Sequence, residues 1–108
     1  MTTNGRPRIY ISGPITGVSD PFPAFARVSQ IYRKKGYRVL NPGRLGRTDP
    51  DWAFRRALRM LLRSDEVAVL VGWEKSKGAR LEVRIAFDLG LPVVESWTGS
   101  AVERTEGL

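Results

Sequence analysis

The strongest candidate for a chemically active group is the carboxylate of Glu82, which follows the segment 73–79, Trp-Glu-Lys-Ser-Lys-Gly-Ala. This polar segment opens directly onto a helical pattern, so the first free N–H groups of that helix would point at a ligand. Ser76 adds a hydroxyl there, and Lys75 or Lys77 adds a counter-charge suited to a phosphate. Glu82, one turn into the helix, could act as a nucleophile or a base, or could simply pair with a neighbouring arginine.

A second polar segment, Ser-Gly-Pro-Ile-Thr-Gly at 12–17, follows a short apolar run and carries two glycines and two hydroxyls. Glycines let the backbone pass close to a ligand. The candidate ligand contacts in this segment are Ser12, Gly13, Thr16 and Gly17. The pattern is neither GxGxxG nor a P-loop, which argues against the usual modes of dinucleotide and ATP binding. A tight turn between a strand and a loop explains the same residues equally well.

The amino-acid composition excludes several kinds of catalytic group and metal site. The 108 residues include no cysteine and no histidine, so a thiolate nucleophile, an imidazole base and a Cys/His zinc site are excluded. No cluster of carboxylates suggests an oxygen-ligated metal, and we expect neither a metal nor a cofactor. A hydrophobic content of 42% and a charged content of 27% are ordinary for one globular domain spanning residues 1–108.

Turn residues divide the chain into alternating strands and helices. Strands are expected at 9–11, 37–40, 67–71 and 91–94, and helices from 20–23 to 36, from 51 to 62 and over 79–89. This order predicts an α/β protein with a Rossmann-like or flavodoxin-like three-layer fold, a short parallel sheet of four to five strands and helices on both faces. The core covers about 8–95, and 98–108 is expected to be a loose C-terminal tail.

The spacing of apolar residues predicts which helix faces are buried. Those expected to face inward are Trp52, Phe54, Leu58, Leu61 and Leu62 in the second helix, and Leu81, Ile85, Ala86 and Leu89 in the third. Ligands bind such sheets at the carboxyl ends of the strands, where the segments 12–18, 41–47 and 72–80 lie. Asn41 and Trp73 fall in these segments, and Trp73 could stack on a base or belong to the core.

The net charge of +7, with 14 arginines among 18 basic residues, favours anionic partners such as nucleic acid, phosphorylated small molecules or an acidic surface. A GC-rich genome explains the arginines equally well. The basic residues are scattered and form no recognised motif, which argues against nucleic acid as a partner. The longest apolar run, 67–71, is far too short for a membrane span, and residues 1–8 lack the apolar stretch of a signal peptide. We therefore expect a cytoplasmic protein without a membrane partner.

Four segments together carry a resemblance to a known family. They are Ile-Tyr-Ile-Ser-Gly-Pro-Ile-Thr-Gly (9–17), Phe-Pro-Ala-Phe (22–25), Val-Leu-Asn-Pro (39–42) and Gly-Trp-Glu-Lys-Ser-Lys-Gly-Ala-Arg-Leu-Glu (72–82). The chain resembles the nucleoside 2-deoxyribosyltransferase-like family over about residues 8–95. Within it, the similarity is to a small phage and bacterial branch of the DUF4406 type, related to deoxynucleoside 5′-monophosphate N-glycosidases.

The resemblance implies a mechanism and a set of site residues. Glu82, at the end of an S-x-G-x-x-x-E stretch, would be the nucleophile that attacks C1′ of a deoxyribosyl group, and Tyr10 would orient it, as in a retaining glycosidase. Ser76 would contact a 5′-phosphate. The candidate substrate-binding residues are then Ser12, Gly13, Thr16, Gly17, Asn41, Trp73, Ser76 and Gly78. The relatives form dimers or higher oligomers, which implies a homo-oligomer that binds a small nucleotide or nucleoside.

One position departs from the family pattern. Relatives carry an aspartate on the second helix, eight residues before the aspartate that precedes the third strand, and counting back from Asp65 gives Ala57. Asp49 or Asp51 could substitute from the adjoining loop. Losing a positioned acid costs about 10² to 10⁴ in rate. Two interpretations follow: an N-glycosidase or deoxyribosyltransferase acting on a deoxynucleoside 5′-monophosphate or deoxynucleoside, or a catalytically weak or inactive nucleotide-binding module.

Overall fold

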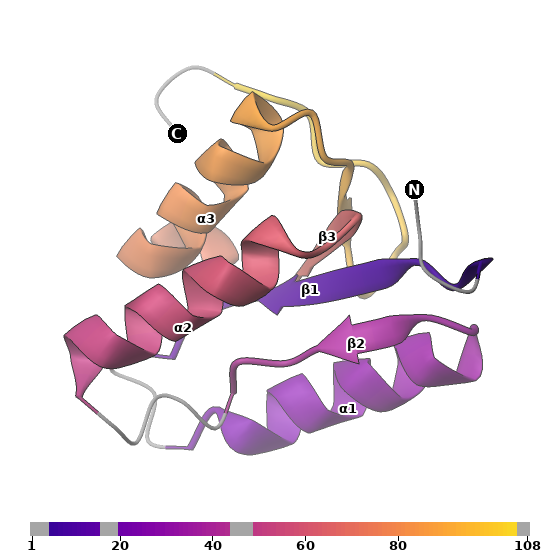
Figure 1. The fold of residues 1–108 in the computed structure, drawn as a ribbon, viewed down its shortest axis with the longest axis horizontal. Coiled ribbons are helices and arrows are strands. Elements are labelled where there is room, and N and C mark those ends of the chain that lie inside the picture. The colour runs from indigo at the N-terminus through magenta and orange to yellow at the C-terminus, as the bar shows by residue number, and fades with distance from the viewer. Residues whose placement is uncertain (1–4, 16–19, 44–48, 106–108) are drawn as a thin grey trace.

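The computed structural model describes residues 5–15, 20–43 and 49–105, and strands alternate with helices along them (Figure 1). The elements are β1 (Arg8–Ser12), α1 (Phe22–Lys34), β2 (Arg38–Leu40), α2 (Pro50–Leu62), β3 (Glu66–Val69), the 3₁₀ turn η3 (Trp73–Lys75), α3 (Lys77–Asp88) and β4 (Val93–Glu95). The expected order of elements is confirmed. Within the described ranges, no helix is both long enough and apolar enough to cross a membrane.

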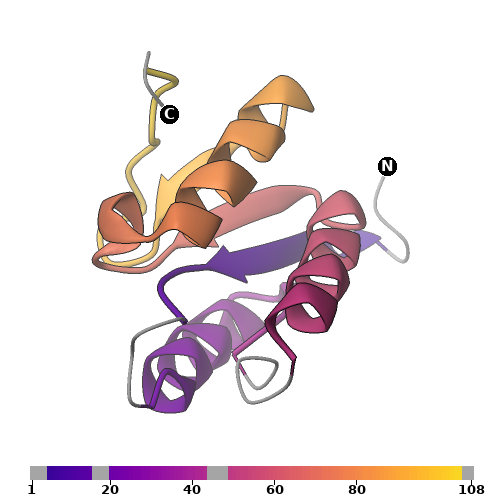
Figure 2. The ribbon, with the colours of Figure 1, turned by 90° about the vertical axis from the view of Figure 1, so that its left-hand side faces the viewer.

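The four strands form one parallel sheet in the order β2-β1-β3-β4, between two layers of helices (Figures 1 and 2). One buried cluster joins α1 to one face of the sheet through Phe25 and Tyr32. A second joins α2 and α3 to the opposite face through Leu61 and Val83. The prediction of an α/β fold with three layers and helices on both faces is therefore confirmed.

The alternation of side chains along β1 determines which of its residues face each layer of helices. Ile9 and Ile11 belong to the cluster under α1, whereas Tyr10 belongs to the cluster under α2 and α3. Because successive residues of a strand point to opposite faces, Ser12 shares the face of Tyr10. All four of these residues are completely buried. The middle strand thus delivers two hydroxyl groups to the α3 side of the sheet.

Two helices begin earlier than the sequence pattern predicts, because their capping residues lie further upstream. Asp49 accepts a hydrogen bond from the backbone N–H of Trp52 at 2.9 Å, so α2 begins at Pro50. Ser76 accepts one from the backbone N–H of Ala79 at 3.2 Å, so α3 begins at Lys77. A side-chain oxygen that satisfies an otherwise unpaired N–H fixes where a helix starts.

The helices are also rotated relative to the expected faces. Trp52, Leu62, Leu81 and Leu89 were predicted to face inward, but they are 46%, 61%, 43% and 51% exposed. Alanines occupy much of the buried surface instead: Ala57 on α2, and Ala79 and Ala86 on α3. Small side chains let the helices lie close to the sheet, and this rotation turns Glu82 into the core. The prediction for the four large side chains was wrong.

The described part of the C-terminal segment is attached to the sheet, whereas the sequence suggested a loose tail. Ala101 pairs antiparallel with Val94, and the backbone N–H of Val102 donates to the carbonyl of Val93 at 2.8 Å. Further along, Arg104 forms an ion pair with Asp88 at 2.6 Å. These contacts place the segment along β4, where it covers backbone groups that would otherwise form an open sheet edge.

Gly13 is required by the packing of β1 against the chain that follows β3. A Cβ atom at Gly13 would lie 2.7 to 2.9 Å from the Cδ1, Cβ and Cγ atoms of Leu70. The adjacent backbone is fixed because the N–H of Leu70 donates to the carbonyl of Ser12 at 2.8 Å. Side-chain rotation alone cannot relieve a clash that includes Cβ. Gly13 therefore has a structural reason for its identity, independent of any ligand.

We expect Gly13→Ala to lower the free energy of unfolding by about 1–3 kcal/mol, because it overpacks a filled site. Gly78→Ala is the matched control: a Cβ there meets nothing within 4 Å, and the helical position gains up to about 1 kcal/mol. Urea denaturation followed by circular dichroism measures both. Equal stabilities for the two variants would show that the contact with Leu70 does not restrict position 13.

Candidate functional site

The sequence-predicted nucleophile, Glu82, lies on the face of α3 that packs on the sheet, and it is only 6% exposed. Both of its carboxylate oxygens accept a hydrogen bond from β1. The hydroxyl of Tyr10 donates to Oε2 at 2.7 Å, and the hydroxyl of Ser12 donates to Oε1 at 2.7 Å. The two donors are the residues that alternation along β1 places on this face. Two points on one strand thus fix the plane of the carboxylate.

Burial and hydrogen bonding act on the Glu82 carboxyl in opposite directions. Removal from water raises the pKa of Glu82 above its ordinary value of 4.5, while the hydrogen bonds from Tyr10 and Ser12 lower it, and burial is the larger effect. The pKa of Tyr10 is raised well above its usual value of 10.0, first by burial and then by the charge of Glu82. Tyr10 therefore remains a protonated donor throughout the physiological range.

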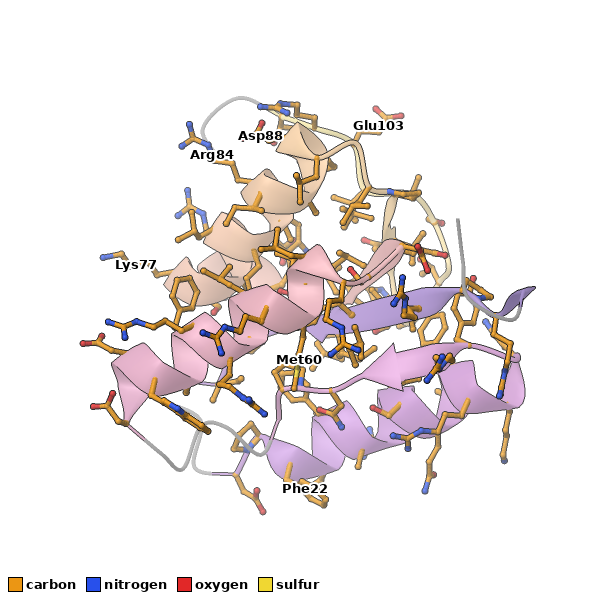
Figure 3. The ribbon with its side chains drawn as sticks, viewed as in Figure 1. Phe22, Met60, Lys77, Arg84, Asp88 and Glu103 are labelled. Carbon is orange, nitrogen blue, oxygen red and sulfur yellow. The ribbon has the colours of Figure 1, made fainter. Side chains whose placement is uncertain are left out.

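No cation balances this carboxylate within the described ranges. Glu82 forms no ion pair there, and its side-chain partners are the two hydroxyls. Arg80 and Arg84 are the two neighbouring arginines in the sequence, and Arg84 points away from the helix layer into solvent (Figure 3). The carboxylate is held by the hydroxyls of Tyr10 and Ser12. A buried, unneutralised carboxylate costs stability, and such groups cluster at functional sites.

The carboxylate is suited to attack on an electron-poor carbon. Each carboxylate oxygen has two acceptor positions, and one hydroxyl donor on each leaves further lone pairs. The carboxyl group cannot rotate without breaking a hydrogen bond, so its orientation is fixed before any substrate arrives. Partial desolvation strengthens its interaction with a developing positive charge. The arrangement therefore combines orientation with electrostatic stabilisation.

In the segment 73–79, which precedes Glu82, some of the predicted ligand contacts are exposed and others are buried or cap the helix. The hydroxyl of Ser76 caps α3, and Gly78 lies in the first turn of that helix with open space beside it. Lys75 and Lys77 are exposed, and Lys77 extends outward from the start of α3 (Figure 3). Trp73 is 6% exposed and belongs to the same buried cluster as Tyr10. Of the two roles left open for Trp73, its position corresponds to the core.

Ser12 and Asn41 lie at the carboxyl edge of the sheet, toward which the arrowheads of β1 and β2 point in Figure 1. Asn41 follows β2, and its Oδ1 accepts a hydrogen bond from the N–H of Gly43 at 2.8 Å, which closes a turn. Ser12, predicted as a substrate contact, donates its hydroxyl hydrogen to Glu82. Thr16 and Gly17 lie outside the described residues. Of the predicted set, the structure thus joins Tyr10, Ser12 and Glu82 directly.

The contact between Ser12 and Glu82 was missed from the sequence, although a signal was available. Tyr10 and Ser12 are two residues apart on one strand, so any group that meets one hydroxyl lies near the other. Metal binding gains no support from the geometry: within residues 5–15, 20–43 and 49–105, no group of three or more His, Cys, Asp or Glu residues is placed to hold an ion.

Comparison with known proteins identifies a family whose function is unknown. A family model described as "Domain of unknown function (DUF4406)" matches residues 7–95. The match spans β1 to β4 and therefore includes Tyr10, Ser12 and Glu82. No curated protein matches the chain.

We expect the Glu82 carboxyl to titrate above 4.5, and the pKa to rise further in Ser12→Ala and Tyr10→Phe, because each variant removes a hydrogen bond to the ionised form. Carbon-13 NMR of glutamate-labelled protein measures this directly. The raised pKa means that ionisation of Glu82 opposes folding. Relative to Glu82→Gln, wild type should therefore lose stability as the pH rises from 4.5 through the folded-state pKa. A pKa near 4.5 that neither variant changes would contradict the geometry.

Proposed function

This chain belongs to the DUF4406 family, a domain of unknown function, and we propose that it cleaves the N-glycosidic bond of a deoxynucleoside 5′-monophosphate, or transfers its deoxyribosyl group. Glu82 is the nucleophile. One observation carries the proposal: a buried carboxylate with no cationic partner among the described residues, held by hydroxyl donors on both oxygens. A carboxylate held in this way suits a reaction whose transition state is an oxocarbenium-like cation.

The reaction has two steps. In the first, a carboxylate oxygen of Glu82 forms a bond to C1′ as the C1′–N bond breaks, and the bonding electron pair leaves with the base, which takes up a proton from solvent. In the second, the oxygen of water attacks C1′ and releases the carboxylate, while the proton of that water passes to solvent. A second nucleobase in place of water gives deoxyribosyl transfer. Tyr10 and Ser12 hold the carboxylate throughout and exchange no proton.

A 5′-phosphate on the substrate is favoured by the start of α3. The N–H groups of the first helical turn and the helix dipole attract anions, and the exposed Lys75 and Lys77 flank this turn. The five residues from Lys77 to Glu82 correspond to a rise of about 7.5 Å along the axis of α3. This separation suits one sugar phosphate, with C1′ at the carboxylate and the phosphate at the helix start.

A second candidate, a nucleotide-binding module without turnover, is favoured by the position of Ala57. This residue is 5% exposed and belongs to the same apolar cluster as Tyr10, so α2 brings no carboxylate to that place. Of the two possible substitutes, Asp49 is engaged as the cap of α2, and Asp51 is exposed in its first turn. Without a positioned acid, proton transfer to the leaving base would be slow.

Release of free base from a panel of deoxynucleoside monophosphates and free deoxynucleosides, followed by chromatography, tests the proposal. We expect Glu82→Gln to lower the rate by about 10⁴-fold or more, because it removes the nucleophile. Glu74→Gln is the matched control, since it removes an exposed carboxylate from the neighbouring turn, and it should retain the wild-type rate. Since Glu82 must be ionised, activity should fall as the pH decreases through its raised pKa.

Two results would contradict the proposal, the first by rejecting turnover and the second by rejecting Glu82 as the nucleophile. If no base is released from any substrate while a nucleotide raises the melting temperature, the binding module is correct. If base release persists in Glu82→Gln at the wild-type rate, the nucleophile is another group.

A further inference from the structure

The outward surface of α2 carries a row of basic side chains with an aromatic ring at one end. Trp52, Arg56, Arg59 and Arg63 are spaced at i, i+4, i+7 and i+11, which puts them on one face of the helix. All four are exposed, and the Trp52 ring is 46% exposed. We call these four residues the α2 stripe. From Arg56 to Arg63 it extends about 10.5 Å along the helix axis.

Among the described residues, no carboxylate neutralises the charges of the α2 stripe. From Trp52 to Ser64 the sequence holds no aspartate or glutamate, and none of the three arginines forms an ion pair within the described ranges. Arg59 lies three residues from Arg56 and four from Arg63, spacings at which like charges repel on a helix. Such a row lowers the stability of the free helix, and an anion lying along it would remove that penalty.

The surface beside the stripe is hollowed. Arg56, Arg59 and Arg63 line a shallow depression of about 400 Å³ together with Met60 and Leu62. Met60 projects from the lower side of α2 in Figure 3, and Leu62 is 61% exposed. Three of the five lining residues are arginines, and the sequence from Trp52 to Ser64 holds no carboxylate. A row of positive charge without interspersed negative charge is the pattern that a polyanion complements.

We propose that the α2 stripe binds single-stranded nucleic acid. Guanidinium groups in a row follow a phosphate backbone and pair with its oxygens. The guanidinium of Arg56 lies over the Trp52 ring, 5.5 Å from its centre, and unpaired bases stack both on exposed aromatic rings and on guanidinium planes. A strand lying along the helix would place phosphates at the arginines and one base at Trp52.

This inference goes beyond the proposed function and does not depend on it. The stripe faces solvent, whereas Glu82 faces the sheet from α3. The sequence argued against a nucleic-acid partner because the basic residues are scattered along the chain. The helical arrangement of α2 brings three of them, with Trp52, into one row.

Fluorescence anisotropy of a labelled 12-nucleotide single-stranded DNA, measured from low to moderate salt, tests the proposal. We expect the oligonucleotide to bind, with the logarithm of its association constant falling linearly with the logarithm of the salt concentration. The double variant Arg56→Gln/Arg59→Gln should make that slope shallower by about 1.4, since each single-strand phosphate contact contributes about 0.7. Arg27→Gln/Arg33→Gln on α1 is the matched control, because it removes the same charge from exposed positions elsewhere. It should leave the slope unchanged.

Trp52→Leu separates base stacking from charge alone. We expect it to weaken binding of the oligonucleotide at least fivefold while leaving binding of polyglutamate unchanged. Thermal melts by circular dichroism confirm that each variant is folded, and glutamine is a good helix former. Three results would overturn the proposal: no DNA binding at low salt, an equal loss in the α1 control, or polyglutamate binding as tightly as DNA with no effect of Trp52→Leu. The last would assign the stripe to an acidic protein.

Discussion

Both oxygens of the Glu82 carboxylate accept hydrogen bonds, from the hydroxyls of Tyr10 and Ser12, and this buried contact joins α3 to β1. A charge in the core is tolerated only when hydrogen bonds compensate its removal from water. β1 must therefore present both hydroxyls to α3, and α3 must be rotated so that Glu82 faces the sheet. The close approach of Gly13 to Leu70 fixes β1 against the chain that leaves β3. The packing of the core therefore also positions the side chains of the candidate site.

Much of this architecture follows from local sequence patterns. Glycine and proline between apolar runs mark where strands end, as at Ser12-Gly13-Pro14, and a continuous apolar run such as Val67–Leu70 indicates a strand buried on both faces. Short-range patterns of this kind determine the order of elements and hence the α/β fold. They also place Glu82 on a helix and Tyr10 on the first strand, where the structure has them.

The features that could not be predicted from the sequence depend on contacts between residues that are far apart in the chain. The rotation of α3 is set by packing of Ala79 and Ala86 on the sheet, which outweighs the local preference to bury Leu81 and Leu89. The donor from Ser12 reaches a carboxylate 70 positions away. The pairing of Ala101 with Val94 likewise depends on backbone hydrogen bonds that leave no side-chain pattern. Each of these three features becomes visible only in the three-dimensional structure.

Nucleophilic attack by Glu82 requires a covalent bond between its side chain and the sugar, and that bond can be detected. Protein mixed with a deoxynucleoside monophosphate, stopped in acid, digested and examined by mass spectrometry should show a deoxyribosyl phosphate on the peptide that contains Glu82. The same peptide from Glu82→Gln should carry none. Release of base at the same rate by both proteins, with no modified peptide in either, would contradict the assignment of Glu82 as the nucleophile.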